Sequence, residues 1–526
     1  MRAASALIEE GYEAKISSEK RQRMAEAAPA LRPGVAFPVG ENGRVSTTVV
    51  AKKIWSAAVR GVDVQLANAI DAERDWRYQY PGHLCKLADL GAKSPANAVK
   101  IAEDGLNTLR GEFVFVKDGA AAPLIEAMST APAAAAALHT GTLQGGAAVA
   151  PLAIPIEDGA DALAMLRELG AAGTCEPSVA SSVEKILGDT AQLAATLSEH
   201  VFVLLGGTSE LCPCLTLARA GATVVVISRP GEKLNTLLRY LDRETAGTIV
   251  VPLSRPQTEA DDAATLGEVA GADVIERGPE LITWLAALYP SKKMVIGSYI
   301  YVDGEAHVRA SVAMDSVLAG VVAARPAGYT AAAYLGSPAT AHVISREAWE
   351  DSRARFEGRP WYHAPFGFAQ NHRPLVEGVT ATGGAASFAV TDGFAVFQGP
   401  NYALAKTLQC WRATLLVQQG VPVSMNMAPG SRTDSVQHSW QAAAAIEGMA
   451  WFEPLRAFDP GFVAATMAVL LLWDLSPAGV AAQKGLGNPG ELVVSNSVHG
   501  GFARCAYTSE SIGKVAFVVG SLGYRA

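Results

Sequence analysis

From residue 200 onward, the apolar positions form short runs that alternate with stretches of helical spacing. The runs are rich in β-branched residues and are bounded by glycine or polar residues, which is typical of buried strands. In chain order they are HVFVLLGG, TVVVISR, GTIVVPL, KMVIGSYIYV and TAAAYLG. Strands that alternate with helices predict right-handed βαβ units. We therefore expect an α/β protein with a doubly wound, Rossmann-like parallel sheet.

The chain before this region has a different pattern. Helical spacing dominates, interrupted by one strand-like run, EFVFV, and by an Ala-rich tract from Gly119 to Pro151 that is either a linker or a pair of helices. We predict an extra, mostly helical N-terminal α/β domain of unassigned role over 1–197 and a nucleotide-binding domain over 198–526. The first residues lack a secretory apolar core and predict a polar helix and a cytoplasmic protein, with organellar import left open.

Composition narrows the classes of partner. The length of 526 residues favours two domains, and the net charge of -8 provides no basic surface for nucleic acid. The longest apolar run, FVAATMAVLLLW, is shorter than the ~20 residues that span a bilayer. Cys212 and Cys214 have no second Cys pair and no His at ligand spacing, so we expect buried thiols and no metal. The remaining expectation is a small-molecule substrate.

A glycine turn follows the first of these strands. Gly206 and Gly207 lie between the strand and a helix, which is the opening of a dinucleotide-binding unit. Amide donors at such a turn favour a pyrophosphate, and Thr208 and Ser209 add hydroxyl donors. Arg229 ends the second strand, where an acidic residue would bind the ribose of NAD and an Arg can pair with the 2′-phosphate of NADP. NADP(H) is therefore favoured over NAD(H), although a solvated Arg is the plainer alternative.

Tyr402 and Lys406 begin a later apolar helix. Residues at i and i+4 share a helix face, so the phenol and the ammonium would point into the same space. A nearby cation favours the phenolate and lowers a phenol pKa from its usual value of ~10. The pair alone also fits an amphipathic helix edge with an extended Lys.

The order Tyr-xxx-Lys, helix, strand and Asn-xx-Pro-Gly-xx-Thr, in NYALAK and MNMAPGSRT, resembles the short-chain dehydrogenase/reductase superfamily over about 200–501. The resemblance implies hydride transfer between NAD(P)(H) and a carbonyl or secondary alcohol. It makes Tyr402 the general acid or base, and Lys406 the group that lowers its pKa and holds the nicotinamide ribose. Pro429, Gly430 and Thr433 would close over the nicotinamide. Relatives often form homo-oligomers.

The same resemblance expects a substrate-orienting serine at the end of the fifth strand. Ser337 has that position, but in family members this serine usually lies much closer to the tyrosine. Either a segment of about 341–395 has been inserted, or the hydroxyl comes from Thr391 or Ser387. We favour Ser337, because strand order changes less readily than loop length.

Several features depart from the family pattern. Leu211 and Pro213 replace the second and third glycines, and GSYIYVDGE stands in place of the Asn-Asn-Ala-Gly segment. ELVVSNSVHGG resembles the final strand, with His499 as a turn cap or, less commonly, an acid or base. Two other functions stay open: a catalytically inactive binding or scaffold protein of this fold, and a sugar-nucleotide epimerase or dehydratase, which also uses a Tyr-Lys pair.

Overall fold

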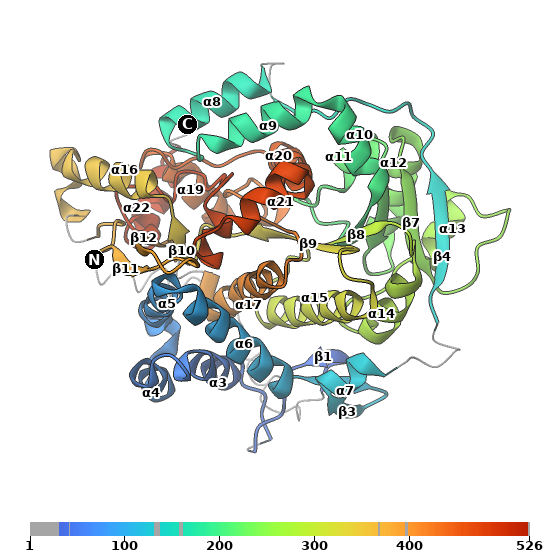
Figure 1. The fold of residues 1–526 in the computed structure, drawn as a ribbon, viewed down its shortest axis with the longest axis horizontal. Coiled ribbons are helices and arrows are strands. Elements are labelled where there is room, and N and C mark those ends of the chain that lie inside the picture. The colour runs from blue at the N-terminus through green and yellow to red at the C-terminus, as the bar shows by residue number, and fades with distance from the viewer. Residues whose placement is uncertain are drawn as a thin grey trace.

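The computed structural model describes residues 31–41, 43–130, 137–156, 161–366, 369–394 and 398–523. At its centre is a seven-stranded sheet with the strand order β13-β9-β8-β5-β6-β7-β4 (Figure 1). The strands are β4 (His139–Gln144), β5 (His200–Leu205), β6 (Thr223–Ile227), β7 (Thr248–Leu253), β8 (Lys293–Ser298), β9 (Thr330–Gly336) and β13 (Val423–Met427). The polar helix predicted at the N-terminus lies outside the described residues.

Neighbouring strands of this sheet pair in parallel, except that β4 pairs antiparallel with β7. From β5 the chain adds β6 and β7 on one side and then returns to place β8, β9 and β13 on the other. Such a reversal is typical of doubly wound α/β folds, whose ligands bind outside the carboxyl ends of the strands. The predicted α/β class with a mostly parallel sheet is confirmed.

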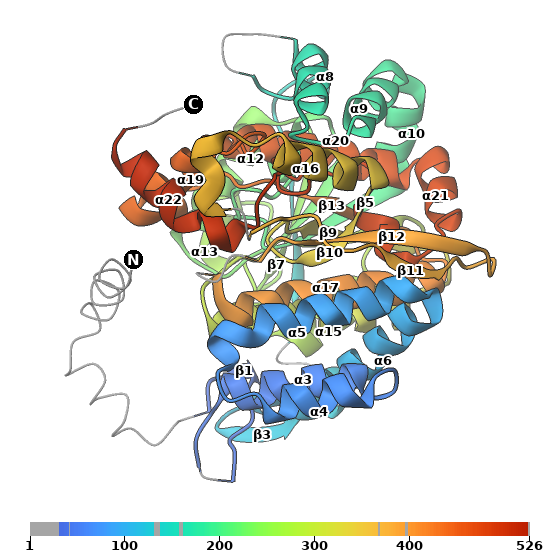
Figure 2. The same ribbon diagram turned by 90° about the vertical axis from the view of Figure 1, so that its left-hand side faces the viewer.

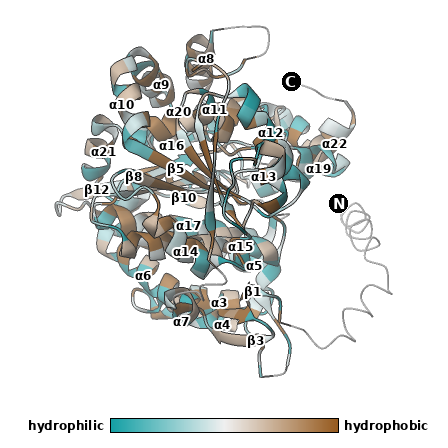
Figure 3. Cartoon of the chain, turned by 90° about the vertical axis from the view of Figure 1, so that its right-hand side faces the viewer, coloured by the Kyte–Doolittle hydropathy of each residue, from teal (hydrophilic) through white to brown (hydrophobic). Residues whose placement is uncertain are grey.

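Helices cover both faces of the sheet (Figure 2). Because side chains alternate along a strand, Val201 and Val203 of β5 face one hydrophobic core, and Phe202 and Leu204 face the other. Around the first core lie α14 (Gly278–Ala287), α15 (Glu305–Ala324) and α17 (Gly399–Gln418). Around the second lie α9 (Ser178–Gly188), α12 (Glu232–Glu244) and α20 (Pro460–Leu475). Figure 3 shows hydrophobic strands between these layers.

The helices before residue 200 join both of these cores. Beyond α15 and α17 lie α3 (Thr47–Arg60), α4 (Val64–Ala72), α5 (Trp76–Lys93) and α6 (Pro95–Glu112) (Figure 2). Gly105 of α6 is so close to Trp411 of α17 that a Cβ there would collide with the ring. On the opposite side, α8 (Ala162–Ala172) packs on α9, which packs on α20. A separate domain ending at residue 197 stays a prediction.

The Ala-rich tract is neither a linker nor a pair of helices, apart from 131–136, which lie outside the described residues. It contains β3 (Ala120–Pro123), the short helix α7 (Leu124–Ser129) and β4. β3 pairs with β2 (Val114–Lys117), the strand predicted at EFVFV, and β2 pairs with β1 (Gly34–Ala36). β4 covers the free edge of β7 and so completes the central sheet.

The segment between β9 and α17, predicted as an insertion over 341–395, forms a three-stranded antiparallel sheet of its own. Its elements are β10 (Ala341–Ile344), α16 (Arg346–Glu357), the 3-10 helix η3 (Trp361–Phe366), β11 (Val376–Val379) and β12 (Ala385–Asp392). β12 lies between β10 and β11. This small sheet packs against α5, on the same side as the helix that carries Tyr402 (Figure 2).

The strand predicted for ELVVSNSVHGG is wrong. Asn488 and Glu491 form a capping box that begins the 3-10 helix η5 (Pro489–Val493). Asn496 then has a φ of 59°, and Gly500 and Gly501 have φ values of 63° and 88°. Left-handed residues interrupt an extended ladder, so the chain continues as turns. α21 (Pro477–Lys484) and α22 (Ser509–Ser521) flank this segment.

Within the described residues, α15 is the one unbroken helix long and apolar enough to cross a bilayer. It lies between α14 and α17, and 72% of its apolar window is buried inside the protein. The core helix of a protein, when it is mostly buried, meets the same criteria of length and apolar composition. α20 and α21 meet them only when taken together across a bend of 74°.

Candidate functional site

Tyr402 and Ser337 meet at the carboxyl edge of the central sheet. Ser337 directly follows β9, and its Oγ accepts a hydrogen bond of 2.7 Å from the Tyr402 hydroxyl. The same Oγ accepts from the backbone N of Ala339 at 3.2 Å, which fixes the serine in the turn. Ser337 is buried, whereas Tyr402 keeps part of its surface exposed. Tyr402 and Ser337 therefore form a hydrogen-bonded pair of hydroxyls just beyond the end of β9.

The two other hydroxyls predicted as partners of Tyr402 lie on β12 and are bonded elsewhere. Thr391 Oγ1 donates to Asn371 Oδ1 at 3.1 Å. Ser387 Oγ donates to the carboxylate of Glu377 at 3.0 Å. Of the three alternatives, the structure brings Ser337 to the tyrosine.

Lys406 lies one turn beyond Tyr402 on α17. Its Nζ donates to the backbone oxygen of Leu335 at 3.1 Å, two residues before Ser337 on the same strand end. Burial lowers the pKa of Lys406 to about 8, because the surroundings disfavour the charged form. The amine is therefore divided between its charged and neutral forms slightly above neutral pH.

The phenol of Tyr402 does not have the lowered pKa expected from its neighbour. Burial raises the pKa of Tyr402 above its usual value, and hydrogen bonding with Ser337 and with Gln398 reduces that rise without cancelling it. The expected lowering by Lys406 does not contribute to this shift, in which burial is the largest cause. At neutral pH Tyr402 carries its proton and can donate it.

His307, in the first turn of α15, is a neighbour that sequence reasoning missed. Its ring centroid lies 5.5 Å from that of Tyr402 and 5.0 Å from that of Tyr301. The imidazole is buried, and Nε2 has no hydrogen-bond partner among the described residues. Burial, and then the charge of Lys406, lower the pKa of His307 to about 3, so it is neutral. Its place just after the fourth predicted strand was the available signal, because such turns face the ligand edge.

Pro429, Gly430 and Thr433 lie in the loop that follows β13. Residue Met427 of β13 pairs with Gly336 of β9, so this loop leaves the sheet beside Ser337. Thr433 is the N-cap residue of the short helix α18 (Asp434–Gln437). The structure therefore places these residues at the same edge as Tyr402.

The glycine turn after β5 uses its amide donors within the chain. Gly206 N and Gly207 N both donate to Ile227 O, at 2.9 and 3.1 Å. Thr208 N donates to Ser228 Oγ at 3.2 Å, and Ser209 N donates to Gly206 O at 2.9 Å. The predicted amide donors are thus directed at the protein's own strands and turn.

Close packing explains the glycines themselves. Gly206 has a φ of 96°, and a Cβ there would lie 2.7 Å from the backbone N of Ile300, two residues after the end of β8. A Cβ on Gly207 would lie 2.6 Å from Val226 of β6. The following helix, α11 (Cys214–Arg219), has only six residues and is preceded by Pro213, which has no N–H.

These observations separate two halves of the predicted cofactor site. Near β9, Tyr402, Lys406 and Ser337 are the groups that the resemblance expects around a nicotinamide riboside. At the glycine turn, the consumed amides and the short helix do not fit a diphosphate in this conformation. Arg229, after β6, is exposed.

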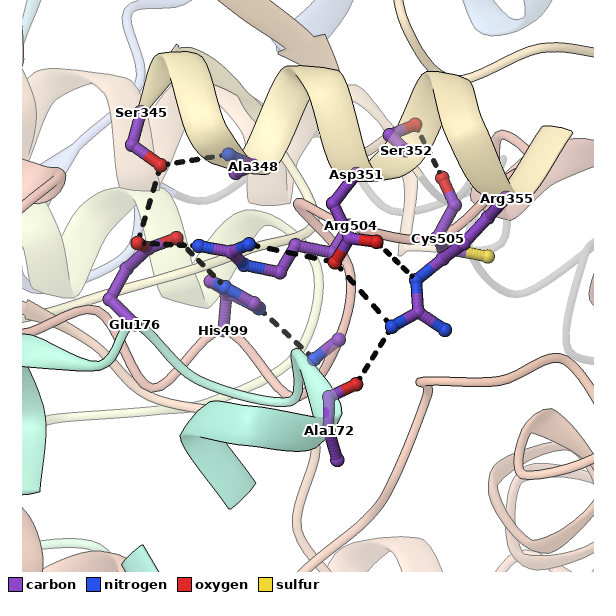
Figure 4. Close-up of polar contacts among 11 residues, drawn as sticks. Ala172, Glu176, Ser345, Ala348, Asp351, Ser352, Arg355, His499, Arg504 and Cys505 are labelled. Atoms are coloured by element: carbon purple, nitrogen blue, oxygen red, sulfur yellow. Dashed lines mark hydrogen bonds and ion pairs between the residues drawn. The ribbon is translucent and has the colours of Figure 1, made fainter. Parts of the chain in front are cut away.

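A second cluster of buried titratable groups lies around His499 (Figure 4). His499 Nδ1 accepts from Gly501 N at 3.1 Å, which leaves the ring proton on Nε2, 3.4 Å from Glu176 Oε1. Arg504 lies 2.9 Å from Glu176 Oε2 and 3.5 Å from Asp351 of α16. The cluster joins the turn after α8, the helix α16 and the C-terminal turns. His499 is thus a turn cap in a structural network.

Comparison with known proteins gives no match to a family model, to a curated protein or to a solved structure. Among the described residues, no group of three His, Cys, Asp or Glu side chains could hold a metal ion. The six cysteines are free, and Cys212 and Cys214 are buried.

Proposed function

We propose that this protein interconverts a carbonyl and a secondary alcohol of a small molecule, with Tyr402 as the acid and base. The observation that carries the proposal is the hydrogen bond of 2.7 Å between Tyr402 and Ser337 at the carboxyl edge of the sheet. Two hydroxyls held together there can both donate to one substrate oxygen. The short-chain dehydrogenase/reductase resemblance names the same residues for the same purpose.

Each residue has a distinct part in the proton transfer. In the reduction, the Tyr402 hydroxyl gives its proton to the carbonyl oxygen; in the oxidation, the phenolate takes it back. Ser337 donates a second hydrogen bond that orients that oxygen. Lys406, when charged, stabilises the phenolate that Tyr402 becomes. The raised pKa of Tyr402 favours the direction in which it begins protonated.

A nicotinamide dinucleotide would supply or accept the hydride. Tyr402, Ser337 and Lys406 would contact its nicotinamide end, and Pro429, Gly430 and Thr433 would border it. Arg229 favours NADP(H) over NAD(H), because a guanidinium pairs well with a phosphate. The diphosphate end requires a conformation of the glycine turn different from the one described.

The test is turnover with a panel of ketones and aldehydes, followed by loss of NADPH or NADH absorbance. Tyr402→Phe removes the proton donor and keeps the ring, and it is expected to lower kcat by ~10²–10⁴-fold. Ser387→Ala, which removes a hydroxyl bonded to Glu377 outside the site, is the matched control and should keep its activity. Activity undiminished in Tyr402→Phe would falsify the acid-base role.

A second candidate is a binding protein that keeps the fold without turnover. It is favoured by the glycine turn, whose amides at 206–209 are all bonded within the chain. This candidate predicts a ligand-dependent rise in melting temperature without consumption of either nicotinamide cofactor. Turnover that depends on Tyr402 excludes it.

A further inference from the structure

A cavity of about 130 Å³ lies between α17 and the helices α5 and α6. Its lining also includes residues of β10, β13 and η5, which pack against α5 or α17 (Figure 2). Helices from before residue 200 thus form one wall, and later parts of the chain form the rest. The lining that the structure describes includes none of the residues assigned to the proposed reaction, so this cavity is a separate place.

The walls of this cavity are largely apolar. Leu87, Ile101 and Trp411 line it with large buried side chains, whereas Ala88 and Gly91 of α5 have little or no side chain and leave the space open. The described lining contains no Asp, Glu, Lys or Arg, so a charged ligand would lose its hydration there without gaining a partner. An apolar cavity of ~150 Å³ is large enough to bind benzene. The space here therefore suits a neutral molecule about the size of one aromatic ring.

His342 of β10 adds a hydrogen-bond acceptor to the same lining. Its Nδ1 lies 3.0 Å from the backbone oxygen of Thr340, and because a carbonyl oxygen only accepts, Nδ1 carries the proton. Burial lowers the pKa of His342 to about 4, so the ring is neutral at pH ~7 and its Nε2 has a lone pair. Among the described residues, Nε2 has no hydrogen-bond partner.

The other polar side chains of the lining impose no comparable requirement. Asn488 is already bonded within the chain: its Nδ2 donates to Gly91 O at 3.0 Å, and its Oδ1 accepts from Gly490 N at 2.8 Å. The hydroxyls of Thr407 and Thr414 can act as donor or as acceptor. The acceptor on His342 is therefore the group that selects a ligand, and it selects one that has a donor.

We propose that this cavity binds a small neutral alcohol or phenol, whose apolar body fills the space between α5 and α17 and whose hydroxyl donates to His342 Nε2. Removal of the apolar body from water supplies the driving force, and the hydrogen bond selects the hydroxyl. A hydrocarbon of the same size leaves the acceptor unpaired. The inference goes beyond the proposed function and does not depend on it.

Two ligands and three variants test this site. The full chain is titrated in a calorimeter with phenol and, separately, with toluene, which has nearly the same shape and no hydroxyl. His342→Phe keeps an aromatic ring and removes the acceptor, whereas Ala88→Leu keeps the acceptor and fills the space. His438→Phe is the matched control, because His438 Nδ1 also bonds to a backbone oxygen, that of Asp434 at 2.6 Å, but the residue is exposed and outside the lining. Melting temperatures show whether each variant is folded.

The wild type and His438→Phe are expected to bind phenol with equal affinity at one site. His342→Phe should bind phenol ~3–10-fold more weakly, the effect of one neutral hydrogen bond, and toluene at least as tightly as the wild type does. Ala88→Leu should bind both ligands more weakly, and this comparison decides alone if His342→Phe does not fold.

The inference is overturned if the wild type binds neither ligand, if His342→Phe weakens phenol and toluene equally or leaves phenol unchanged, or if Ala88→Leu binds phenol like the wild type. Binding is measured without turnover, so the two proposals fail separately. A protein that reduces no carbonyl and still binds phenol in the expected pattern removes the proposed function and leaves this site standing.

Discussion

Arg412 on α17 and Asp315 on α15 form a buried ion pair, with Nε 2.6 Å from Oδ1 and a terminal nitrogen 3.1 Å from Oδ2. Arg110 of α6 reaches the same carboxylate at 3.3 Å. Burial alone would raise the pKa of Asp315, but the charges of Arg412 and Arg110 hold it below its usual value. One carboxylate thus ties together three helices, one of which carries Tyr402.

Asp315→Asn is expected to destabilise the fold by ~3–5 kcal/mol, because it leaves two arginines partly unpaired in a buried place. The measurement is the free energy of unfolding from urea titration. Asp104→Asn is the matched control, since it breaks the exposed ion pair of Asp104 with Lys100 on α6 at 2.7 Å. Such a pair is worth ~0.3–0.5 kcal/mol. Similar losses of unfolding free energy in both variants would show that the buried ion pair stabilises the fold no more than the exposed one.

The charge on Lys406 predicts how the reduction rate depends on pH. Since burial lowers the pKa of Lys406 to about 8, the ammonium that supports the phenolate disappears as the pH rises through that value. The single-turnover rate of carbonyl reduction should fall on the alkaline side with a midpoint near the same pH. Lys406→Arg keeps its charge and should move that fall to higher pH in whatever activity remains. A rate that stays flat from pH ~7 to ~9 in the wild type contradicts the role of Lys406.

The parts of the fold that the sequence predicts well are the strands buried on both faces. β5 to β9 appear as continuous apolar runs because helices cover them on both sides, and this signal does not depend on distant partners. Strand order then places Ser337 and Tyr402 at one edge although 65 residues separate them. Strand order therefore predicted Ser337 as the hydroxyl partner of Tyr402. The small sheet between β9 and α17 leaves that strand order unchanged.

Other features depend on pairing that no local pattern contains. β4 has the polar sequence HTGTLQ and becomes a strand because β7 offers it a free edge. Glu210, in the turn after β5, accepts a hydrogen bond from the backbone N of Asp434, which is 224 residues away in the chain. The rise in the pKa of Tyr402 depends on how completely its neighbours exclude water, which spacing on a helix does not determine.

Asp474 near the end of α20 predicts a pH dependence of stability. Its Oδ2 accepts from Ser424 Oγ at 2.8 Å and from Asn426 Nδ2 at 2.7 Å, and burial raises its pKa to about 7. The folded protein therefore holds a proton there between pH ~4 and about 7 that the unfolded chain has lost. This contribution to stability is complete below pH ~4 and is lost as the pH rises through about 7.

Asp474→Asn keeps an acceptor for both donors and cannot titrate. The free energy of unfolding of the wild type is expected to fall by up to ~4 kcal/mol more than that of this variant as the pH rises from ~4 to ~8. The measurement is urea unfolding at a series of pH values. Asp303→Asn, at an exposed position, is the control and should follow the wild type. Parallel curves for wild type and Asp474→Asn would mean that Asp474 is ionised throughout.

From the contacts of Arg504 we predict that this residue holds the helix α16 to the rest of the protein. Its guanidinium lies between Glu176 and Asp351 (Figure 4), so Arg504→Met leaves a buried carboxylate with one fewer charged partner. We expect a loss of ~3–5 kcal/mol, concentrated in α16, and faster amide hydrogen exchange there than in α6. Arg353→Met on the same helix breaks an exposed pair with Glu357 and should leave exchange unchanged. If both variants exchange alike, Arg504 does not hold α16 in place, and the other contacts of the helix retain it, among them the hydrogen bond from Ser352 Oγ to Cys505 O.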